Sequence, residues 1–405
     1  VSDNSLGKLI KSGGYDTFYG GKVHMAPALV PLKAGYDEFC KDQRDELPGA
    51  CIEFMTRKRD KPFFAVASFI NPHDICFAYN ARQPKRRGMP LVNKLYKEAQ
   101  ALPADKLPPL PKNSAIPERE PEAIEATMKV TSTTPAKLIR KDYNERDWRN
   151  YRWIYCRLTE RVDAQIGRLL DALKKNGLEK NTLVIFMTDN GMAGATGMKN
   201  GKKFASFNLG MKGAKATVHE GGTRVPSFWM WKGRIKEGVD IDALTGHIDF
   251  YRTMCELAGT KVPKSKLPPK GRSLLPLFDN LKPEWPNRTL FFHRGRWDDK
   301  IWDHDAMETH RYRNGAARST RWRWIDNKEL YDISLDPGQR ENVAKKNPEV
   351  MKQMKEAYDA WWNTLGPLQV NAGKEQITKG NFPLQKRYQK RIKLGKLPEW
   401  SPKPI

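Results

Sequence analysis

Residues 181–191 read NTLVIFMTDNG, and this stretch decides the fold class. Its first part is a short apolar run, which is typical of a buried strand, and polar residues follow it at once. A long helix is predicted before it, over residues 148–176. Its buried face is predicted to carry Ile154, Leu158, Val162, Ile166, Leu169 and Leu173. A helix, then a buried strand, then polar residues is the pattern of an α/β sheet with a ligand site at its carboxyl edge.

Other segments extend this pattern toward both ends of the chain. A helix is expected over 5–14, and a strand that runs into a turn begins at residue 16. KPFFAVASFI (61–70) predicts a strand buried on both faces, RVPSFWMWK (224–232) another strand, and 247–259 a helix. We therefore expect an α/β fold with a mostly parallel central sheet flanked by helices.

The domain organisation follows from changes in composition. An α/β domain is expected over 1–285, and within it the proline-rich residues 77–145 predict an irregular loop excursion. Short strands and a final helix predict a smaller C-terminal α+β subdomain over 286–366. Residues 367–405 form a basic tail.

The 405 residues carry a formal net charge of +25, much of it outside the periodic segments. These charges either form a solvated surface and tail or attract a polyanion. No helix-turn-helix, zinc-finger or RNP signature accompanies them, so nucleic acid is not expected as a partner. A sulfated or carboxylated polysaccharide fits the charge.

The five cysteines are odd in number and include no Cys-x-x-Cys pair. Neither a zinc site nor a full disulfide framework is indicated, although Cys40 and Cys51 could close one small loop. The sequence contains no run of transmembrane length and no signal peptide at its start.

Two candidate catalytic clusters lie near predicted strand ends. In the first, Lys22 and His24 are two residues apart, so on an extended chain they point the same way. A phosphate-binding P-loop is excluded, because Asp16 and Val23 stand where glycine and a magnesium-binding hydroxyl belong. In the second, His73 of the NPHD stretch is a candidate general acid. The alternative for both clusters is an ordinary surface lysine and hydrogen-bonded histidines.

Two further clusters suit cation and anion binding. Asp189 and Asn190 offer oxygen ligands for Ca²⁺ or Mg²⁺, with other ligands needed, or else they form an ordinary Asn-Gly turn. Lys212 and Lys215, followed by Glu220 in MKGAKATVHEGGTRVP (211–226), could neutralise an anionic group and a departing oxyanion. The alternative for this segment is a flexible basic loop.

The order of these clusters along the chain is specific. GYDTFYGGKVHM (14–25), MTDNG (187–191), KATVHEGGTRVP (215–226) and ELYDISLDPGQRENVA (329–344) follow one another. In this combination, which covers nearly the whole chain, the sequence resembles the formylglycine-dependent sulfatases of the alkaline phosphatase superfamily.

The resemblance implies a reaction and its cofactors. A formylglycine hydrate attacks the sulfur of a sulfate ester, and a divalent cation, Ca²⁺ or Mg²⁺, holds the sulfate oxygens. Asp189 and Asn190 match two of the cation ligands.

The resemblance also assigns roles to basic residues. Lys22 and His24 match residues that contact the formylglycine, and His24 would later help to expel sulfate. His73 matches the proton donor of the leaving group, and Lys215 matches a residue that binds a sulfate oxygen. Lys212 stands where arginine is frequent, which keeps the charge and loses the bidentate fork.

One departure from the family pattern is large. The family takes its nucleophile from a Cys or Ser in a C/S-x-P-S-R segment, and these 405 residues contain none. The resemblance therefore implies an N-terminally truncated sulfatase that is inactive alone, whose formylglycine comes from an upstream residue. It also implies a formylglycine-generating maturation enzyme as partner and a periplasmic or secreted location.

The substrate is expected to be a sulfated small molecule or polysaccharide. His293 is a candidate sugar contact, together with Arg296, Trp297 and His304. Two alternatives stay open: a phosphate or phosphonate ester hydrolase of the same superfamily, and a non-catalytic polyanion-binding relative.

Overall fold

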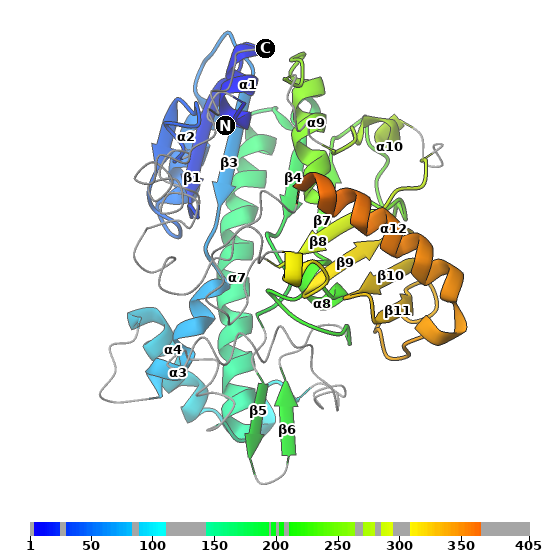
Figure 1. The fold of residues 1–405 in the computed structure, drawn as a ribbon. Coiled ribbons are helices and arrows are strands. Elements are labelled where there is room, and N and C mark those ends of the chain that lie inside the picture. The colour runs from blue at the N-terminus through cyan, green and yellow to red at the C-terminus, as the bar shows by residue number, and fades with distance from the viewer. Residues whose placement is uncertain are drawn as a thin grey trace, which may run out of the picture. The chain divides into compact units, whose positions relative to one another are not determined.

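The computed structural model describes residues 4–24, 30–82, 89–110, 143–193, 196–199, 202–205, 210–263, 270–279, 285–294 and 308–365. Figure 1 shows the fold as a ribbon, and the chain divides into two compact units. The first unit comprises Val1–Pro108, Arg149–Phe186 and Phe228–Trp285. The second comprises Pro109–Trp148, Met187–Ser227 and Pro286–Ile405. The predicted basic tail, residues 367–405, lies outside the described residues.

The first unit is built on a parallel sheet. Strand β1 (Asp16–Gly21) lies between β2 (Glu38–Cys40) and β3 (Phe63–Ser68), and all three run in the same direction. A second, two-stranded sheet pairs β4 (Val184–Met187) with β7 (Ser227–Met230), and most of its residues belong to this unit.

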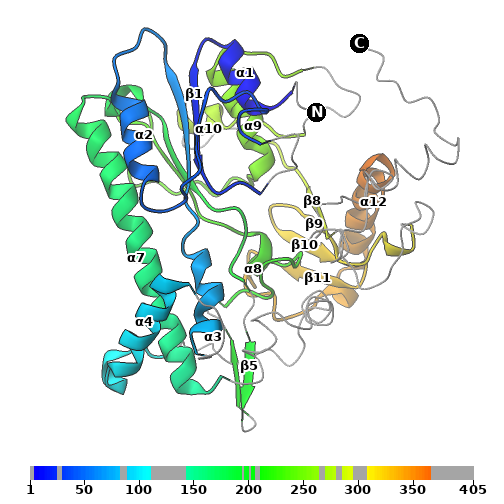
Figure 2. The same cartoon turned by 90° about the vertical axis from the view of Figure 1, so that its left-hand side faces the viewer.

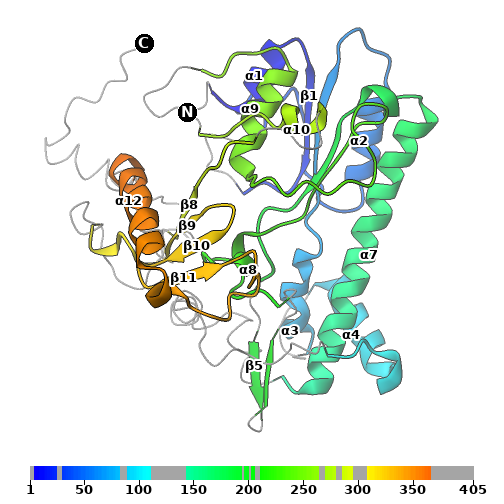
Figure 3. The ribbon, with the colours of Figure 1, turned by 90° about the vertical axis from the view of Figure 1, so that its right-hand side faces the viewer.

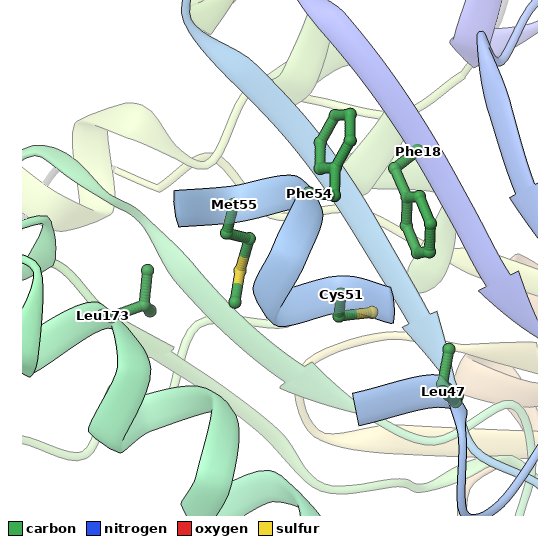
Figure 4. Packing of buried hydrophobic residues seen from close by; sticks show 6 residues of the cluster. All are labelled: Phe18, Leu47, Cys51, Phe54, Met55 and Leu173. Atoms are coloured by element: carbon green, nitrogen blue, oxygen red, sulfur yellow. The ribbon is translucent and has the colours of Figure 1, made fainter. Parts of the chain in front are cut away.

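One face of the parallel sheet β2–β1–β3 packs against α2 (Leu47–Thr56) and the long helix α7 (Glu145–Lys175), which Figure 2 shows side by side. Alternate β3 residues, Phe63, Ala65 and Ala67, point to this side, as the two-residue period of a strand requires. Figure 4 shows the cluster that fills the layer, formed by Phe18, Leu47, Cys51, Phe54, Met55 and Leu173.

The other face packs against α1 (Leu6–Ser12) and α9 (His247–Leu257), which lie beside each other in Figure 3. Phe64, the β3 residue of opposite parity, joins Ile10 and Met254 there. Ser5 occupies the N-cap position of α1 as predicted, but its hydroxyl donates to the Ala34 carbonyl at 2.7 Å instead of capping the helix. The predicted α/β class, with helices on both faces of a parallel sheet, is confirmed.

Two local expectations were wrong. β3 is half-buried along its whole length rather than buried on both faces, because among the described residues it pairs only with β1. The irregular excursion predicted from residue 77 begins with helices, including α4 (Pro90–Ala101). Proline is tolerated at the first turn of a helix, and four apolar residues at helical spacing, Val92, Leu95, Tyr96 and Ala99, are buried. Residues 111–142 of that excursion lie outside the described part.

The remaining elements of the first unit are short. They are the 3-10 helices η2 (His73–Phe77), η3 (Ala104–Lys106) and η4 (Glu179–Asn181) and the helices α3 (Ala78–Ala81) and α10 (Leu275–Asp279). None of the helices among the described residues combines the length and apolar character that crossing a bilayer requires. Cys40 and Cys51 are both free thiols, so the loop closure considered from the sequence is not formed.

The second unit has an antiparallel sheet with a helix on one face. Its strands are β8 (Leu290–His293), β9 (Gly315–Arg318), β10 (Trp322–Ile325) and β11 (Glu329–Asp332), which neighbour one another in that order. Helix α12 (Pro348–Leu365) buries Met354, Tyr358 and Trp362 against Trp324 and Leu330. The predicted C-terminal α+β architecture is present (Figure 3).

Short elements complete the second unit. They are the hairpin strands β5 (Thr196–Lys199) and β6 (Lys202–Ala205), helix α8 (Glu220–Thr223), and the 3-10 helices η5 (Glu308–His310) and η6 (Ala344–Lys346).

Candidate functional site

In the first unit, candidate residues follow the carboxyl ends of β1 and β3. Lys22 and His24 come directly after β1, and the Lys22 amide donates a hydrogen bond to the Ser68 carbonyl at 2.7 Å. Gly21 has a φ of 99°, and a Cβ at this position would lie 2.1 Å from the same carbonyl oxygen. The glycine before Lys22 therefore serves the close approach of two strand ends rather than a phosphate.

His73 lies on the segment that follows β3, exposed at the start of η2. Its neighbour Asp74 is 1% exposed and accepts two hydrogen bonds from Arg44, at 2.8 Å from Nε and 2.6 Å from Nη2. The turn that presents His73 is thus tied down by a bidentate ion pair. Arg44 was not predicted from the sequence, because it lies 30 positions from Asp74 and no local pattern links the two residues.

In the second unit, backbone hydrogen bonds join the turn after β4 to the glycine-rich loop. The Gly191 amide donates to the Gly222 carbonyl at 3.0 Å, and the Lys215 amide donates to the Met192 carbonyl at 2.8 Å. The third and fourth sequence clusters, which carry Asp189–Asn190 and Lys215, therefore lie together.

Glycines make this approach possible. A Cβ on Gly191 in the turn would lie 2.0 Å from the Gly221 carbonyl oxygen in the loop. Within the loop itself, a Cβ on Gly222 would lie 2.4 Å from the Ala214 carbonyl oxygen. Both distances are far below van der Waals contact, so the backbones could not approach this closely with any other residue.

The turn offers oxygen ligands for a hard cation. Asp189 is exposed and Asn190 is half-buried. The Asn190 amide nitrogen donates to the Gly191 carbonyl at 2.9 Å, so Oδ1 is the atom that remains to act as a ligand. Calcium takes about six to eight oxygen ligands. The described residues contain no group of three or more His, Cys, Asp or Glu side chains able to hold a metal. Asp189 and Asn190 carry the oxygen atoms that a hard cation binds, and they would supply only part of its coordination shell.

The two lysines of the loop differ sharply. Lys215 is exposed, next to Ala216 in the left-handed region at φ 69°. Lys212 is 15% exposed, and its ammonium lies 2.6 Å from the Tyr331 hydroxyl and 3.3 Å from Glu329 Oε2. The substrate contact predicted for Lys212 gains no support from these contacts, whereas Lys215 is open to a ligand.

Glu220, the acidic residue of the same motif, is held by two arginines. Arg318 Nε donates to Glu220 Oε1 at 2.9 Å, and Arg323, 1% exposed, donates to the same oxygen. Burial opposes ionisation of Glu220, but the charges of Arg323 and Arg318 outweigh it and hold the pKa of the carboxyl below its usual range. The arginines were missed because they lie about 100 residues away along the chain.

His293 lies on β8, where its ring packs edge-on against Trp362 with centroids 4.8 Å apart. Its Nε2 lies 3.1 Å from the His310 carbonyl oxygen, and burial lowers the pKa of His293 to about 4. These are packing contacts, so the sugar contact predicted for His293 gains no support from them. Arg296, Trp297 and His304 lie outside the described residues.

Comparisons with known proteins agree on one family. The family model described as Sulfatase matches residues 2–260, and the model described as N-sulphoglucosamine sulphohydrolase, C-terminal, matches residues 213–362. A Delta 4,5-hexuronate-2-O-sulfatase from Bacteroides thetaiotaomicron is 25% identical over 84% of this chain and 67% of its own length. In two further curated relatives the match spans only 37% and 36% of the relative's length.

Solved structures share the fold at lower identity. One, solved in complex with its substrate D-glucosamine-2-N,6-O-disulfate, has a TM-score of 0.54 at 18% identity and covers 89% of this chain and 81% of its own. A phosphonate monoester hydrolase from Silicibacter pomeroyi has a TM-score of 0.52 at 16% identity, with 92% and 81% covered.

Proposed function

Because the chain belongs to the sulfatase family, we propose that it contributes the cation-binding turn, the sulfate-binding lysine and the acid histidine to an enzyme that hydrolyses sulfate esters of glycans. The observation that carries this proposal is the pair of backbone hydrogen bonds from Gly191 to Gly222 and from Lys215 to Met192. They join the backbone of the loop that carries the exposed Lys215 to that of the turn that carries Asp189 and Asn190.

The chemistry of these residues matches what sulfate ester cleavage requires. Asp189 and Asn190 would hold Ca²⁺ or Mg²⁺, which supplies positive charge to the sulfate oxygens. Lys215 adds a second positive charge, which stabilises the charge that develops during displacement at sulfur. Lys215 is exposed and forms no ion pair with another described residue, so its ammonium is available to a sulfate oxygen.

His73 is the proposed proton donor to the leaving alcohol oxygen. His73 is exposed, and the ion pair between Arg44 and the buried Asp74 holds the turn that carries it. Lys22 and His24 are the proposed neighbours of a formylglycine, which supplies the nucleophile. The 405 residues contain no Cys/Ser-x-Pro-x-Arg segment, so we expect this chain alone not to hydrolyse sulfate esters.

The proposed substrate class is a sulfated glycan. The named relatives act on, or are bound to, sulfated sugars, and the net charge of +25 would attract a polyanion. The alternative, a phosphonate or phosphate ester hydrolase, has the solved phosphonate monoester hydrolase in its favour, and that likeness concerns the fold alone.

Sulfate release from sulfated disaccharides tests the proposal. We would assay the 405-residue chain and a chimera in which the nucleophile segment of a sulfatase relative precedes it. The chain should release none, and the chimera should release sulfate in a divalent-cation-dependent way that Lys215→Ala lowers at least about 100-fold. Phosphonate hydrolysis in preference to sulfate release would overturn the proposal, and turnover by the 405 residues alone would overturn the expected inactivity.

A further inference from the structure

The carboxylate of Glu329 on β11 contacts both ends of the loop formed by residues 212–219. At one end, Lys212 Nζ lies 3.3 Å from Glu329 Oε2. At the other end, His219 Nε2 lies 3.7 Å from the same oxygen. Lys215 lies between these two anchored ends.

The strand itself reinforces this carboxylate. The Tyr331 hydroxyl donates to Glu329 Oε2 at 2.7 Å and accepts a hydrogen bond from Lys212 Nζ at 2.6 Å. The three side chains Lys212, Tyr331 and Glu329 thus form a closed ring of contacts. Despite the cost of burial, the neighbours His219, Tyr331 and Lys212 lower the pKa of Glu329 to about 2, so the carboxylate is ionised at neutral pH.

His219 has no other polar anchor among the described residues. It is 5% exposed, and neither ring nitrogen makes a hydrogen bond there. At 3.7 Å its contact with Glu329 is too long for a hydrogen bond and acts through the charge of the carboxylate. The buried imidazole therefore depends for compensation on Glu329, the carboxylate with which it pairs among the described residues.

Backbone contacts show that the segment after β11 holds the same two ends. The Lys212 amide donates to the Gly338 carbonyl at 3.2 Å, and the Glu220 amide donates to Gln339 Oε1 at 2.7 Å. The loop is therefore fixed at its ends by β11 and the turn that follows it, and Lys215 at its middle is exposed.

We propose that Glu329 is a positioning residue for Lys215: it draws the two ends of loop 212–219 to one carboxylate and so fixes where the exposed ammonium is held. This inference rests on the proposed function in one respect, which is that the ligand bound by Lys215 is a sulfate group. Glu329 influences the ligand indirectly, by holding the loop. Its Oε2 pairs with Lys212, accepts a hydrogen bond from Tyr331 and lies next to His219.

The test compares Glu329→Gln with Glu341→Gln in the 405-residue chain. Glu341 forms an exposed ion pair with Lys346 in the same unit and is the matched control. Hydrogen exchange of residues 212–219 and of β8–β10 is measured together with the dissociation constant for inorganic sulfate. We expect Glu329→Gln to speed exchange in the loop at least about tenfold, with β8–β10 unchanged, and to weaken sulfate binding about three- to tenfold. Glu341→Gln should change neither.

Unchanged exchange in the loop of folded Glu329→Gln would overturn the proposal, as would an equal rise across β8–β10, which marks general destabilisation. Should Glu329→Gln not fold, Tyr331→Phe provides the same test, because it removes the hydroxyl that joins Lys212 to Glu329. The loop of Tyr331→Phe should then exchange about threefold faster, and wild-type exchange there would overturn the proposal. A wild-type chain that binds no sulfate counts against the proposed function alone, since the exchange experiment still reads the position of the loop.

Discussion

The Arg44 guanidinium forms a bidentate ion pair with the Asp74 carboxylate: Nε donates to Oδ2 at 2.8 Å and Nη2 donates to Oδ1 at 2.6 Å. Arg44→Ala leaves Asp74, which is 1% exposed, as a charge with no ion-pair partner among the described residues. We expect this to lower the free energy of unfolding in urea by about 3 kcal/mol. Arg57→Ala, which breaks an exposed pair with Glu38, should cost about 0–1 kcal/mol. Equal costs for the two variants would contradict the structural role of the Asp74 pair.

Glu220→Gln removes the charge that compensates Arg323, which is 1% exposed and whose pKa burial lowers to about 10 despite Glu220. A buried guanidinium without its carboxylate should destabilise the second unit by about 3–5 kcal/mol, measured by urea unfolding. Arg323→Met in the same background removes the stranded charge and should restore part of the loss. A double variant no more stable than Glu220→Gln would show that the ion pair is not the cause.

Gly222→Ala places a methyl group 2.4 Å from the Ala214 carbonyl oxygen, so the two sides of the glycine-rich loop must move apart. We expect a loss of about 1–3 kcal/mol in unfolding free energy, together with weaker binding of sulfate. Gly167→Ala on α7 is the matched control, because a Cβ there meets no atom within 4 Å. It should stabilise the protein by up to about 1 kcal/mol, since alanine is the better helix former. The same loss in both variants would rule out the close approach as the cause.

The stability of the second unit should fall in mild acid because of His293. Its pKa is lowered from 6.5 to about 4 in the folded state. Above pH 6.5 the His293 ring is neutral in both the folded and the unfolded state. Between pH 6.5 and 4 it is protonated in the unfolded chain and stays neutral in the folded chain. Stability is therefore lost between pH 6.5 and 4 and levels off below pH 4, by about 3 kcal/mol in all.

The check is the slope of unfolding free energy against pH over that window. His293→Phe keeps a ring against Trp362 and does not titrate, so between pH 6.5 and 4 it should lose about 3 kcal/mol less stability than the wild type. A His293→Phe slope equal to the wild-type slope would refute the assignment.

Local pattern predicted most of the first unit's secondary structure. The apolar run before TDNG became β4, and the helical spacing from Ile154 to Leu173 became α7. α4 was missed because prolines nearby hid four buried residues at helical spacing. What no local pattern could reveal is pairing at long range, such as Arg323 with Glu220 or Lys212 with Glu329, because those contacts exist only once the sheet of the second unit has formed.

The candidate site shows the same division. The order of the motifs assigned Asp189, Asn190 and Lys215 to one family pattern, and backbone hydrogen bonds join the turn and the loop that carry them. Their chemical roles stay predictions. The difference between the two lysines of the loop was invisible in the sequence, because burial, not residue type, separates Lys212 from Lys215.

The half-buried β3 has a consequence for how the protein behaves in solution. Within the described residues its hydrogen bonds to other strands all go to β1, and β4 pairs only with β7, although Phe64 and Ile185 of these two strands share one apolar cluster. Along its other edge, β3 has no strand partner within the described residues, and core side chains flank that edge. Such an edge is a template for another extended segment, so concentrated solutions of the isolated chain are expected to associate edge to edge, and dilution or a capping peptide should reverse it.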